Sequence, residues 1–144
     1  MKTVRQLLQS KGSESWSVTP DTLVYDALSL MAEKNIGAIL VMEGGRLVGI
    51  LSERDYARKV VLHGKSSKEI PVREIMTARV VYVQPDQTVE DCMALMTDKR
   101  VRHLPVLDGE RVVGVISIGD VVKSIISEQS FMIEQLEHYI AGAR

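Results

Sequence analysis

The sequence carries one short pattern twice, and its residues can form hydrogen bonds with a bound molecule. The copies lie at residues 49–55 and 114–120, and each contains a glycine, two apolar residues, a serine and, three residues after the serine, an aspartate. Both copies end an apolar run and begin a segment with helical spacing. Each copy therefore predicts a corner at which a strand ends and a helix begins.

Two roles are open for the pairs Ser52/Asp55 and Ser117/Asp120. A serine followed three residues later by an acid forms a capping box, in which both side chains bind free backbone N–H groups. Capping boxes usually carry Glu or Gln at the third position, whereas here the acid is aspartate both times. The alternative is ligand binding, because nucleotide sites use a carboxylate to accept hydrogen bonds from ribose hydroxyls. The duplication favours this second role.

The neighbours of each corner could complete a nucleotide site. The helix N-terminus and the serine hydroxyl supply donors for a phosphate or ribose oxygen. Ile50 and Val115 lie beside the corners and could cover the face of a base.

Positive charge is distributed unequally between the corners. Arg102 and His103 correspond, in the first half of the chain, to Gly37 and Ala38. Arg54, beside Asp55, likewise corresponds to a glycine. We therefore expect the two sites to hold different ligands or different parts of them.

Patterns typical of catalysis find little support. His63, His103 and His138 stand in unrelated contexts, and Cys92 lies on the apolar face of a predicted helix, where a free cysteine is usually part of the core. The sequence has no glycine-rich phosphate loop, no nucleophile elbow and no His/Cys set at metal spacing. We expect neither an enzyme nor a bound metal.

The corners belong to a larger internal repeat. Residues 18–61 align with residues 83–126 without a gap, at a shift of 65 positions, and about a third of the pairs are identical. Residues 72–76 also resemble residues 4–8. Each unit has the pattern strand, helix, strand, strand, helix. Two copies predict one α/β domain with approximate twofold symmetry and a cleft between its halves.

The repeat sets the expected organisation of the chain. We place the first unit at residues 3–63, a polar linker at 64–71, the second unit at 72–126 and a C-terminal extension at 127–144. Apolar residues keep three-four spacing from about residue 119 to 140, which predicts one long helix. Its apolar face needs cover, from its own globule or from a second copy of the chain.

Composition and charge exclude several classes of partner. The 144 residues include 18 basic and 19 acidic side chains, so no surplus charge draws the chain to nucleic acid or membrane. The start lacks the apolar core of a signal peptide, and no apolar run reaches membrane-spanning length. The single cysteine excludes an internal disulfide. We expect a cytoplasmic protein.

The duplicated corners, the Pro-Asp pairs at 20–21 and 85–86, and residues 102–106 together resemble CBS domains. These domains occur in tandem as a Bateman module, and the resemblance covers about residues 3–126. The chain is similar to stand-alone bacterial CBS-pair proteins. The family implies tandem pseudo-twofold β-α-β-β-α repeats, adenosine-containing ligands in the cleft between them, and pairing into disc-like dimers.

The resemblance also implies two sets of ligand-binding residues. The first site comprises Ser52, Asp55, Ile50, Val80, Val81, Arg102, His103 and Pro105. The second site comprises Ser117, Asp120, Val115, Trp16, Val18, Gly37 and Ala38, with Arg54 reaching toward its phosphate.

Two hypotheses about the function therefore remain. The leading hypothesis is a non-enzymatic energy sensor that binds AMP, ADP, ATP or NAD(H) and acts as a homodimer on an unidentified regulated protein. The alternative is an interaction and dimerisation module whose cleft is empty or binds S-adenosylmethionine. The residues Arg54, Arg102 and His103 suit an anion and favour the first hypothesis.

Overall fold

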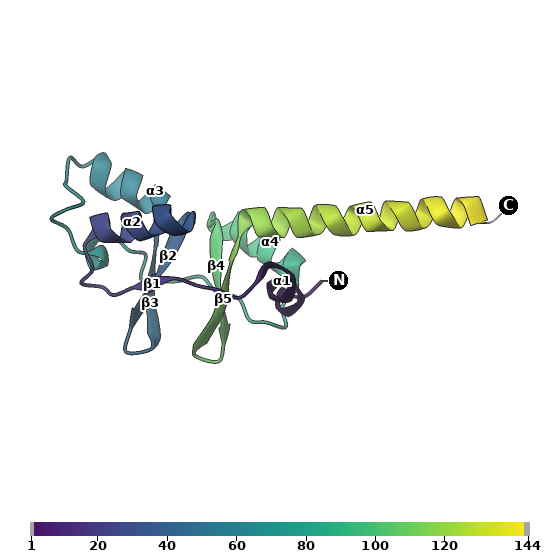
Figure 1. Ribbon diagram of the computed structural model, residues 1–144, viewed down its shortest axis with the longest axis horizontal. Coiled ribbons are helices and arrows are strands. Elements are labelled where there is room, and N and C mark those ends of the chain that lie inside the picture. Colours follow the sequence, from purple (N-terminus) through teal and green to yellow (C-terminus); the bar gives the residue numbers. More distant parts are fainter. Residues whose placement is uncertain (1, 143–144) are drawn as a thin grey trace.

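Two antiparallel hairpins form the centre of the molecule. The computed structural model describes residues 2–142, and its long strands are β2 (Ala38–Glu43), β3 (Arg46–Ser52), β4 (His103–Asp108) and β5 (Arg111–Ser117). β2 pairs with β3 and β4 with β5, and the hairpins lie side by side with their turns at the same end (Figure 1). The two consecutive strands predicted in each unit are confirmed, and they pair as a hairpin.

The repeat extends to the details of the backbone. Both hairpins shift register at one irregularity, after Val41 in the first and after Val106 in the second. Both turns contain a glycine with positive φ, 59° at Gly44 and 66° at Gly109, a conformation that other residues adopt only with strain. Equivalent sequence positions therefore take equivalent conformations.

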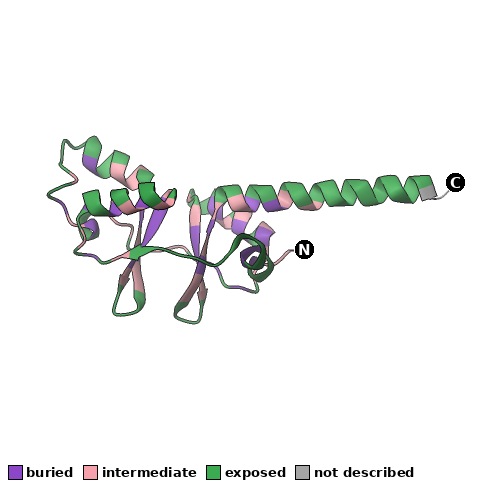
Figure 2. Ribbon diagram, in the orientation of Figure 1, coloured by how far each residue is buried: buried purple, intermediate pink, exposed green. Residues whose placement is uncertain are grey.

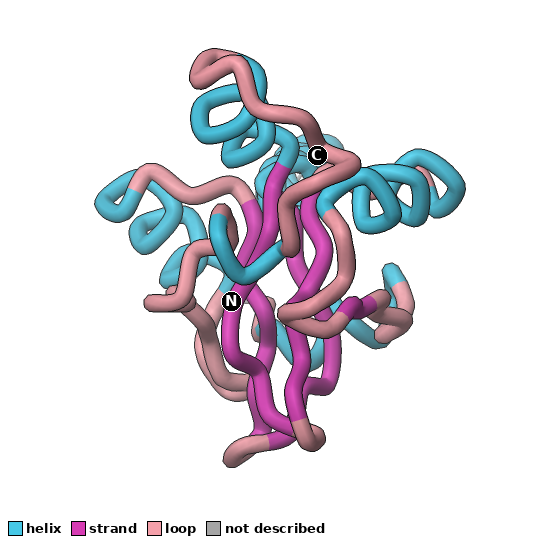
Figure 3. Tube along the Cα trace, turned by 90° about the vertical axis from the view of Figure 1, so that its left-hand side faces the viewer, coloured by secondary structure: helices cyan, strands magenta, loops and turns pink. Residues whose placement is uncertain are grey.

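One helix of each half covers its hairpin. α2 (Val24–Lys34) and α4 (Val89–Lys99) stand at equivalent positions of the repeat, and each buries three residues at helical spacing. Each ends at a residue in the left-handed conformation with φ of 55°, Asn35 in the first half and Arg100 in the second. Helices surround the strands at their upper end (Figure 3).

The segments that follow the two corners differ. In the first half the short helix α3 (Glu53–Tyr56) passes into a π-helical turn, η1 (Ala57–Val61). In the second half one continuous helix, α5 (Ile118–Gly142), runs unbroken through Ser127 and Ser130. The predicted long helix is thus confirmed, and its outer part projects away from the strands (Figure 1).

The segment that precedes each unit packs on the other half of the chain. α1 (Val4–Lys11) lies beside the second hairpin, and Val4 and Leu7 are buried in the core of that half. The turn η2 (Val72–Glu74) and Ile75 belong in the same way to the core of the first half. The chain therefore crosses between the halves twice. The segment before the first unit packs in the core of the second half, and the segment before the second unit packs in the core of the first half.

The short strand β1 (Ser17–Val18) follows this crossing. It pairs in parallel with β2, which gives a three-stranded sheet in the first half. In the second half, Val83 forms a single parallel bridge with Val106 at the equivalent place. Together these elements confirm the predicted α/β class with tandem pseudo-twofold repeats.

The glycine of each corner pattern is explained by this crossing. A Cβ at Gly49 would lie 2.6 Å from Sδ of Met76, and one at Gly114 would lie 2.7 Å from Cδ2 of Leu8. Met76 and Leu8 belong to the equivalent crossing segments. The conserved spacing of the glycine therefore reflects close packing of the chain on itself rather than approach of a ligand.

The outer part of α5 is exposed (Figure 2), and several of its exposed side chains are large and apolar and form a stripe along the helix. The relative exposure of these side chains is between 56% and 76%. The stripe residues are Ile126, Met132, Ile133, Leu136, Tyr139 and Ile140. Such a face is unusual on a helix that remains in water.

Candidate functional site

Two pockets lie against the two corners. The first has a volume of about 250 Å³ and adjoins Ser52 and Asp55, whereas the second has about 310 Å³ and adjoins Ser117 and Asp120. Both lie near the lower end of the range of about 300–1,000 Å³ that small-molecule pockets usually occupy. Both predicted corners thus stand at a cavity.

The serine and aspartate of the first corner form a complete capping box. The backbone N–H and hydroxyl of Ser52 each donate to Oδ2 of Asp55 at 3.0 Å, and the backbone N–H of Asp55 donates to Oγ of Ser52 at 3.2 Å. Lys59, one turn further along, approaches Oδ1 of Asp55 at 3.2 Å. The structural role of this pair is therefore real.

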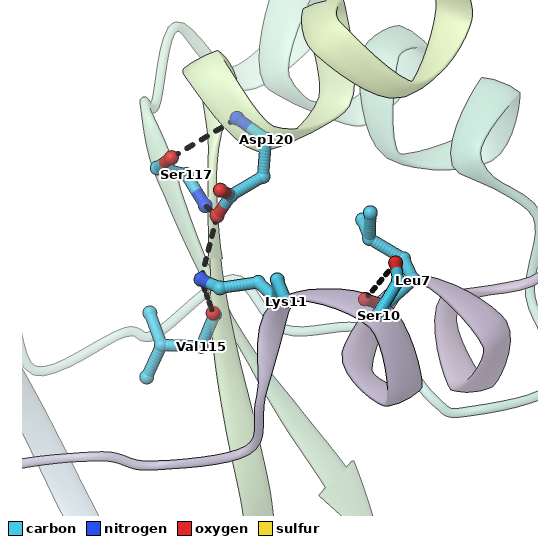
Figure 4. Close-up of polar contacts among 6 residues, drawn as sticks. All are labelled: Leu7, Ser10, Lys11, Val115, Ser117 and Asp120. Atoms are coloured by element: carbon cyan, nitrogen blue, oxygen red, sulfur yellow. Dashed lines mark hydrogen bonds and ion pairs between the residues drawn. The ribbon is translucent and has the colours of Figure 1, made fainter. Parts of the chain in front are cut away.

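The second corner repeats the box but adds a cation from a distant element (Figure 4). The backbone N–H of Ser117 donates to Oδ2 of Asp120 at 2.8 Å, and that of Asp120 donates to Oγ of Ser117 at 3.2 Å. The ammonium of Lys11, at the end of α1, donates to Oδ2 of Asp120 at 2.6 Å and to the carbonyl of Val115 at 2.8 Å. Burial alone would raise the pKa of Asp120, but the hydrogen bonds from Lys11 and Ser117 outweigh it and hold the pKa below its usual value.

A cap does not prevent an aspartate from binding a ligand. A carboxylate has two oxygens with about four acceptor positions, and the capping bonds fall on Oδ2 in both corners. Both aspartates also line their pockets. The corner can therefore hold its helix and still accept hydrogen bonds from a molecule in the cavity.

The first pocket is strongly basic. Five arginine side chains line it, against two acids, Glu53 and Asp55. These arginines are Arg54, Arg58, Arg79, Arg100 and Arg102. In the part of the chain that the structure describes, none of the five belongs to a recorded ion pair. Five cations against two acids leave a surplus of positive charge, which favours an anionic occupant.

Arg79 and Lys11 are functional candidates that sequence reasoning missed. The resemblance of residues 72–76 to residues 4–8 gives a shift of 68 positions, and extending it by three residues pairs Arg79 with Lys11. Thr77 exchanges two backbone hydrogen bonds with Ile50, at 3.0 and 2.9 Å, which fixes the segment before Arg79 at the edge of the first pocket. The extended alignment is the signal that would have found both residues.

His103 lies on the wall that separates the two pockets. It lines both of them, as do Gly37 and Ala38. The imidazole packs so closely on Gly37 that a Cβ there would lie 3.3 Å from the ring. Burial lowers the pKa of His103 below its usual value, although Glu53 and Asp120 act in the opposite direction. A neutral imidazole at this place can donate one hydrogen bond and accept another.

Most of the residues predicted for the first site meet in the first pocket. These are Ile50, Ser52, Asp55, Val81, Arg102 and His103. Val80 and Pro105 do not line it. Pro105 is buried in β4, where it pairs with Val115 and its carbonyl accepts the backbone N–H of Val83 at 3.0 Å.

Most of the residues predicted for the second site likewise meet in the second pocket. These are Trp16, Gly37, Ala38, Val115, Ser117 and Asp120. Val18 does not line it and packs instead against the core of the first half.

Arg54 lies at a different pocket from the one expected. We expect it to reach toward the second site, but it lines the first pocket. The reason is local, because Arg54 stands in the first turn of α3 beside Asp55 and shares the corner of that pocket. The second pocket receives its cation from Lys11 instead.

Within residues 2–142, no group of three or more His, Cys, Asp or Glu side chains could hold a metal ion. Over the same range, no helix has both the length and the apolar character needed to cross a membrane.

The fold and the paired pockets define a duplicated α/β module with one serine–aspartate corner beside a pocket in each half. The family model that describes the CBS domain matches residues 13–62 and 72–127. The chain belongs to the CBS domain family and is a CBS pair, a regulatory type of module.

Relatives and solved structures agree with this assignment. The mitochondrial CBS domain-containing protein CBSX3 of Arabidopsis thaliana is 40% identical over 150 residues, which cover 97% of this chain and 72% of the relative. The structure of a protein with CBS domains from Burkholderia ambifaria MC40-6 is 57% identical, with a TM-score of 0.86 over 89% of this chain and 96% of that chain.

A more distant neighbour shares the fold. The CBS domain pair of protein MJ0100, solved in complex with 5′-methylthioadenosine and S-adenosyl-L-methionine, is 23% identical. Its TM-score is 0.79, over 89% of this chain and 98% of that chain.

Proposed function

We propose that this chain is a non-enzymatic sensor that binds an adenine nucleotide in its first pocket, with AMP, ADP, ATP and NAD(H) as the candidate ligands. The ribose would bind the carboxylate of Asp55, and the phosphate would face the arginines. Occupancy would be reported to a regulated protein whose identity is open. The corners, the pockets and the family together support this proposal.

The observation that carries the proposal is the arginine cluster of the first pocket. Between residues 2 and 142 none of the five guanidinium groups forms an ion pair, and the pocket lining contains three more arginines than acids, so an anion among them would be stabilised. Arginine matches the geometry of a phosphate, to which it donates two parallel hydrogen bonds. The overall charge of the chain is −1, so the cluster is a local feature rather than a consequence of composition.

The backbone at Arg100 gives independent support. This residue ends α4 in the left-handed conformation, with φ of 55°. A side chain other than Gly or Asn usually pays about 1–2 kcal/mol for that conformation. Its counterpart is Asn35, a residue that tolerates the conformation well. An arginine at the strained position of the first pocket suggests selection for charge.

The adenosine part of the ligand rests on the corner and on a structural neighbour. Asp55 retains exposed carboxylate surface, and its side chain is 16% accessible. Ile50 and Val81 offer apolar surface for a base in the same pocket. The MJ0100 pair, which shares the fold, is in complex with two adenosine-containing compounds.

The alternative is a dimerisation and interaction module whose cleft is empty or binds S-adenosylmethionine. The second pocket gives it some support, since Glu14 and Asp120 suit a cationic ligand. The first pocket argues against it, because a sulfonium ion beside five arginines would be repelled. We therefore prefer the nucleotide.

The proposal also includes an oligomeric state and a cellular compartment. The apolar stripe of α5 supports self-association, with a homodimer as the smallest assembly. The single cysteine, Cys92, is buried, which is compatible with the reducing cytoplasm that we propose as the compartment.

The substitution Arg102→Ala tests the phosphate role. Because a hydrogen bond to a charged group contributes roughly 1.5–3 kcal/mol, we expect AMP to bind at least about tenfold more weakly. The affinity for adenosine, which has no phosphate, should change little. Titration calorimetry with both ligands measures the two effects.

The control is Arg111→Ala, which removes the same charge from an exposed position at the start of β5. It should leave both affinities unchanged. An equal loss for AMP and adenosine in the Arg102→Ala chain would contradict a contact between Arg102 and phosphate.

A further inference from the structure

We propose that Lys11 selects the ligands of the second pocket, an inference that rests on the proposed function. In the free protein its ammonium is bound to Oδ2 of Asp120 and to the carbonyl of Val115, so an uncharged nucleoside that uses either acceptor competes with the lysine. A nucleotide brings a phosphate that offers Lys11 a new partner. The second pocket would therefore discriminate against nucleosides and admit nucleotides.

The first argument is the position of the ammonium. Lys11 lines the second pocket and donates to Oδ2 of Asp120 and to the carbonyl of Val115, at 2.6 and 2.8 Å (Figure 4). Oδ2 of Asp120 also accepts the backbone N–H of Ser117 at 2.8 Å. The ammonium thus lies between two acceptors of residues that line the second pocket, and a ligand that uses either acceptor would compete with it.

The second argument is the contrast with the first pocket. Arg79, the counterpart of Lys11, lines that pocket and belongs to no ion pair recorded between residues 2 and 142. The cation that meets Asp55 is Lys59, which comes from the same helical segment and does not line the pocket. In the first corner the carboxylate is therefore paired with a cation outside the pocket lining, whereas in the second it is paired with the cation that lines the pocket.

The third argument is the charge that surrounds Lys11. The second pocket contains the acids Glu14 and Asp120, and Lys11 is the one cation among its lining residues apart from His103, whose pKa burial lowers. The contact between Lys11 and Asp120 is only partly buried, with side-chain exposures of 33% and 24%. Such a pair can be opened by a ligand at moderate cost. A phosphate is the chemical group that would keep the ammonium bound after it leaves the carboxylate.

The test is the substitution Lys11→Met, which keeps a long apolar side chain and removes the ammonium. To report on the second pocket, we would make it in an Asp55→Asn chain that also carries Arg102→Ala, so that the first pocket lacks both its carboxylate and the arginine proposed to bind phosphate. Titration calorimetry with adenosine and with AMP should give opposite results. Adenosine should bind about tenfold more tightly than without the Lys11 substitution, and AMP about tenfold more weakly.

The matched control is Lys123→Met in the same doubly substituted chain, because Lys123 is exposed on α5 and lines neither pocket. It should change neither affinity. A merely structural role for Lys11 would move both ligands in the same direction, and this result or no change would overturn the inference while nucleotide binding by the wild-type chain stands. If neither ligand binds the wild-type chain, the proposed function fails and the selection by Lys11 fails with it.

Discussion

Asp55 and Asp120 hold equivalent positions in the two halves, yet cations of different origin contact them. Lys59 comes from the same helical segment as Asp55, whereas Lys11 reaches Asp120 from the other end of the chain. Both aspartates cap a helix through the same hydrogen bonds to serine. At the scale of the residue, the repeated motif therefore determines the hydrogen bonds of the helix cap. Which cation contacts the aspartate depends on the elements that pack around each corner.

From the lowered pKa of His103 we expect the stability of the folded chain to depend on pH. Burial lowers the pKa of His103 in the folded chain, with Arg102 and Lys11 acting in the same direction and Glu53 and Asp120 against it. Because the unfolded chain then binds the proton more readily, folding stability should fall as the pH drops below about 6.5. The loss should not exceed about 1.4 kcal/mol for each pH unit. Urea denaturation between pH 7.5 and 5 measures it.

A variant isolates the contribution of this residue. His103→Gln does not titrate, so its stability should depend less steeply on pH in the same range. The control His63→Gln changes an exposed histidine and should keep the wild-type slope. Identical slopes in the wild-type and His103→Gln chains would contradict a lowered pKa for the partly buried His103.

At the scale of elements, the crossing segments explain what the sequence pattern could and could not predict. Hairpins, the helices α2 and α4 and the corners depend on spacing over a few residues, and the sequence predicted them. The placement of α1 on the second half depends on contacts between residues about 80–110 positions apart, such as those of Leu7 and Leu8 with the second core. Lys11 escaped notice because its role follows from that placement.

The pocket that Arg54 lines also could not be predicted from the sequence. Its charge and its position beside Asp55 were plain in the sequence, but its pocket depends on where the other half of the chain lies. The charged residues of the first pocket come from three separate segments, at 53–58, 79 and 100–102. That these segments meet in one pocket could be seen only from the three-dimensional structure.

The stripe on α5 predicts self-association. The substitutions Met132→Glu and Leu136→Glu together place two charges on this face, whose side chains at these positions are 58% and 60% exposed. Since a buried charge without a partner is costly, we expect any assembly that uses the stripe to dissociate. Sedimentation velocity of the wild-type chain should show a dimer or a larger assembly, and the variant should sediment as a monomer.

A control on the opposite side of the helix keeps this prediction specific. Ser127→Glu adds a charge to α5 away from the stripe and should leave the assembly intact. A wild-type chain that sediments as a monomer at all concentrations would contradict the proposed use of the stripe. So would an assembly that survives both stripe substitutions.

At the scale of the whole molecule, a symmetric fold carries an asymmetric distribution of charge. The net charge is only −1, yet one pocket has five arginines and the other a lysine held by an aspartate. Gly37, Ala38 and His103 form a wall common to both pockets. A ligand in one pocket therefore contacts residues that also border the other, which gives the two sites a physical means of influencing each other.

The crystal structure of the chain grown with AMP tests the central claim most directly. We predict AMP in the first pocket, with its ribose hydroxyls within hydrogen-bond distance of Asp55 and its phosphate contacting Arg102 and at least one further arginine of the cluster. AMP bound elsewhere, or with its phosphate directed away from the arginines, would contradict the account. So would crystals in which the first pocket stays empty at saturating AMP, and that result would favour the interaction module.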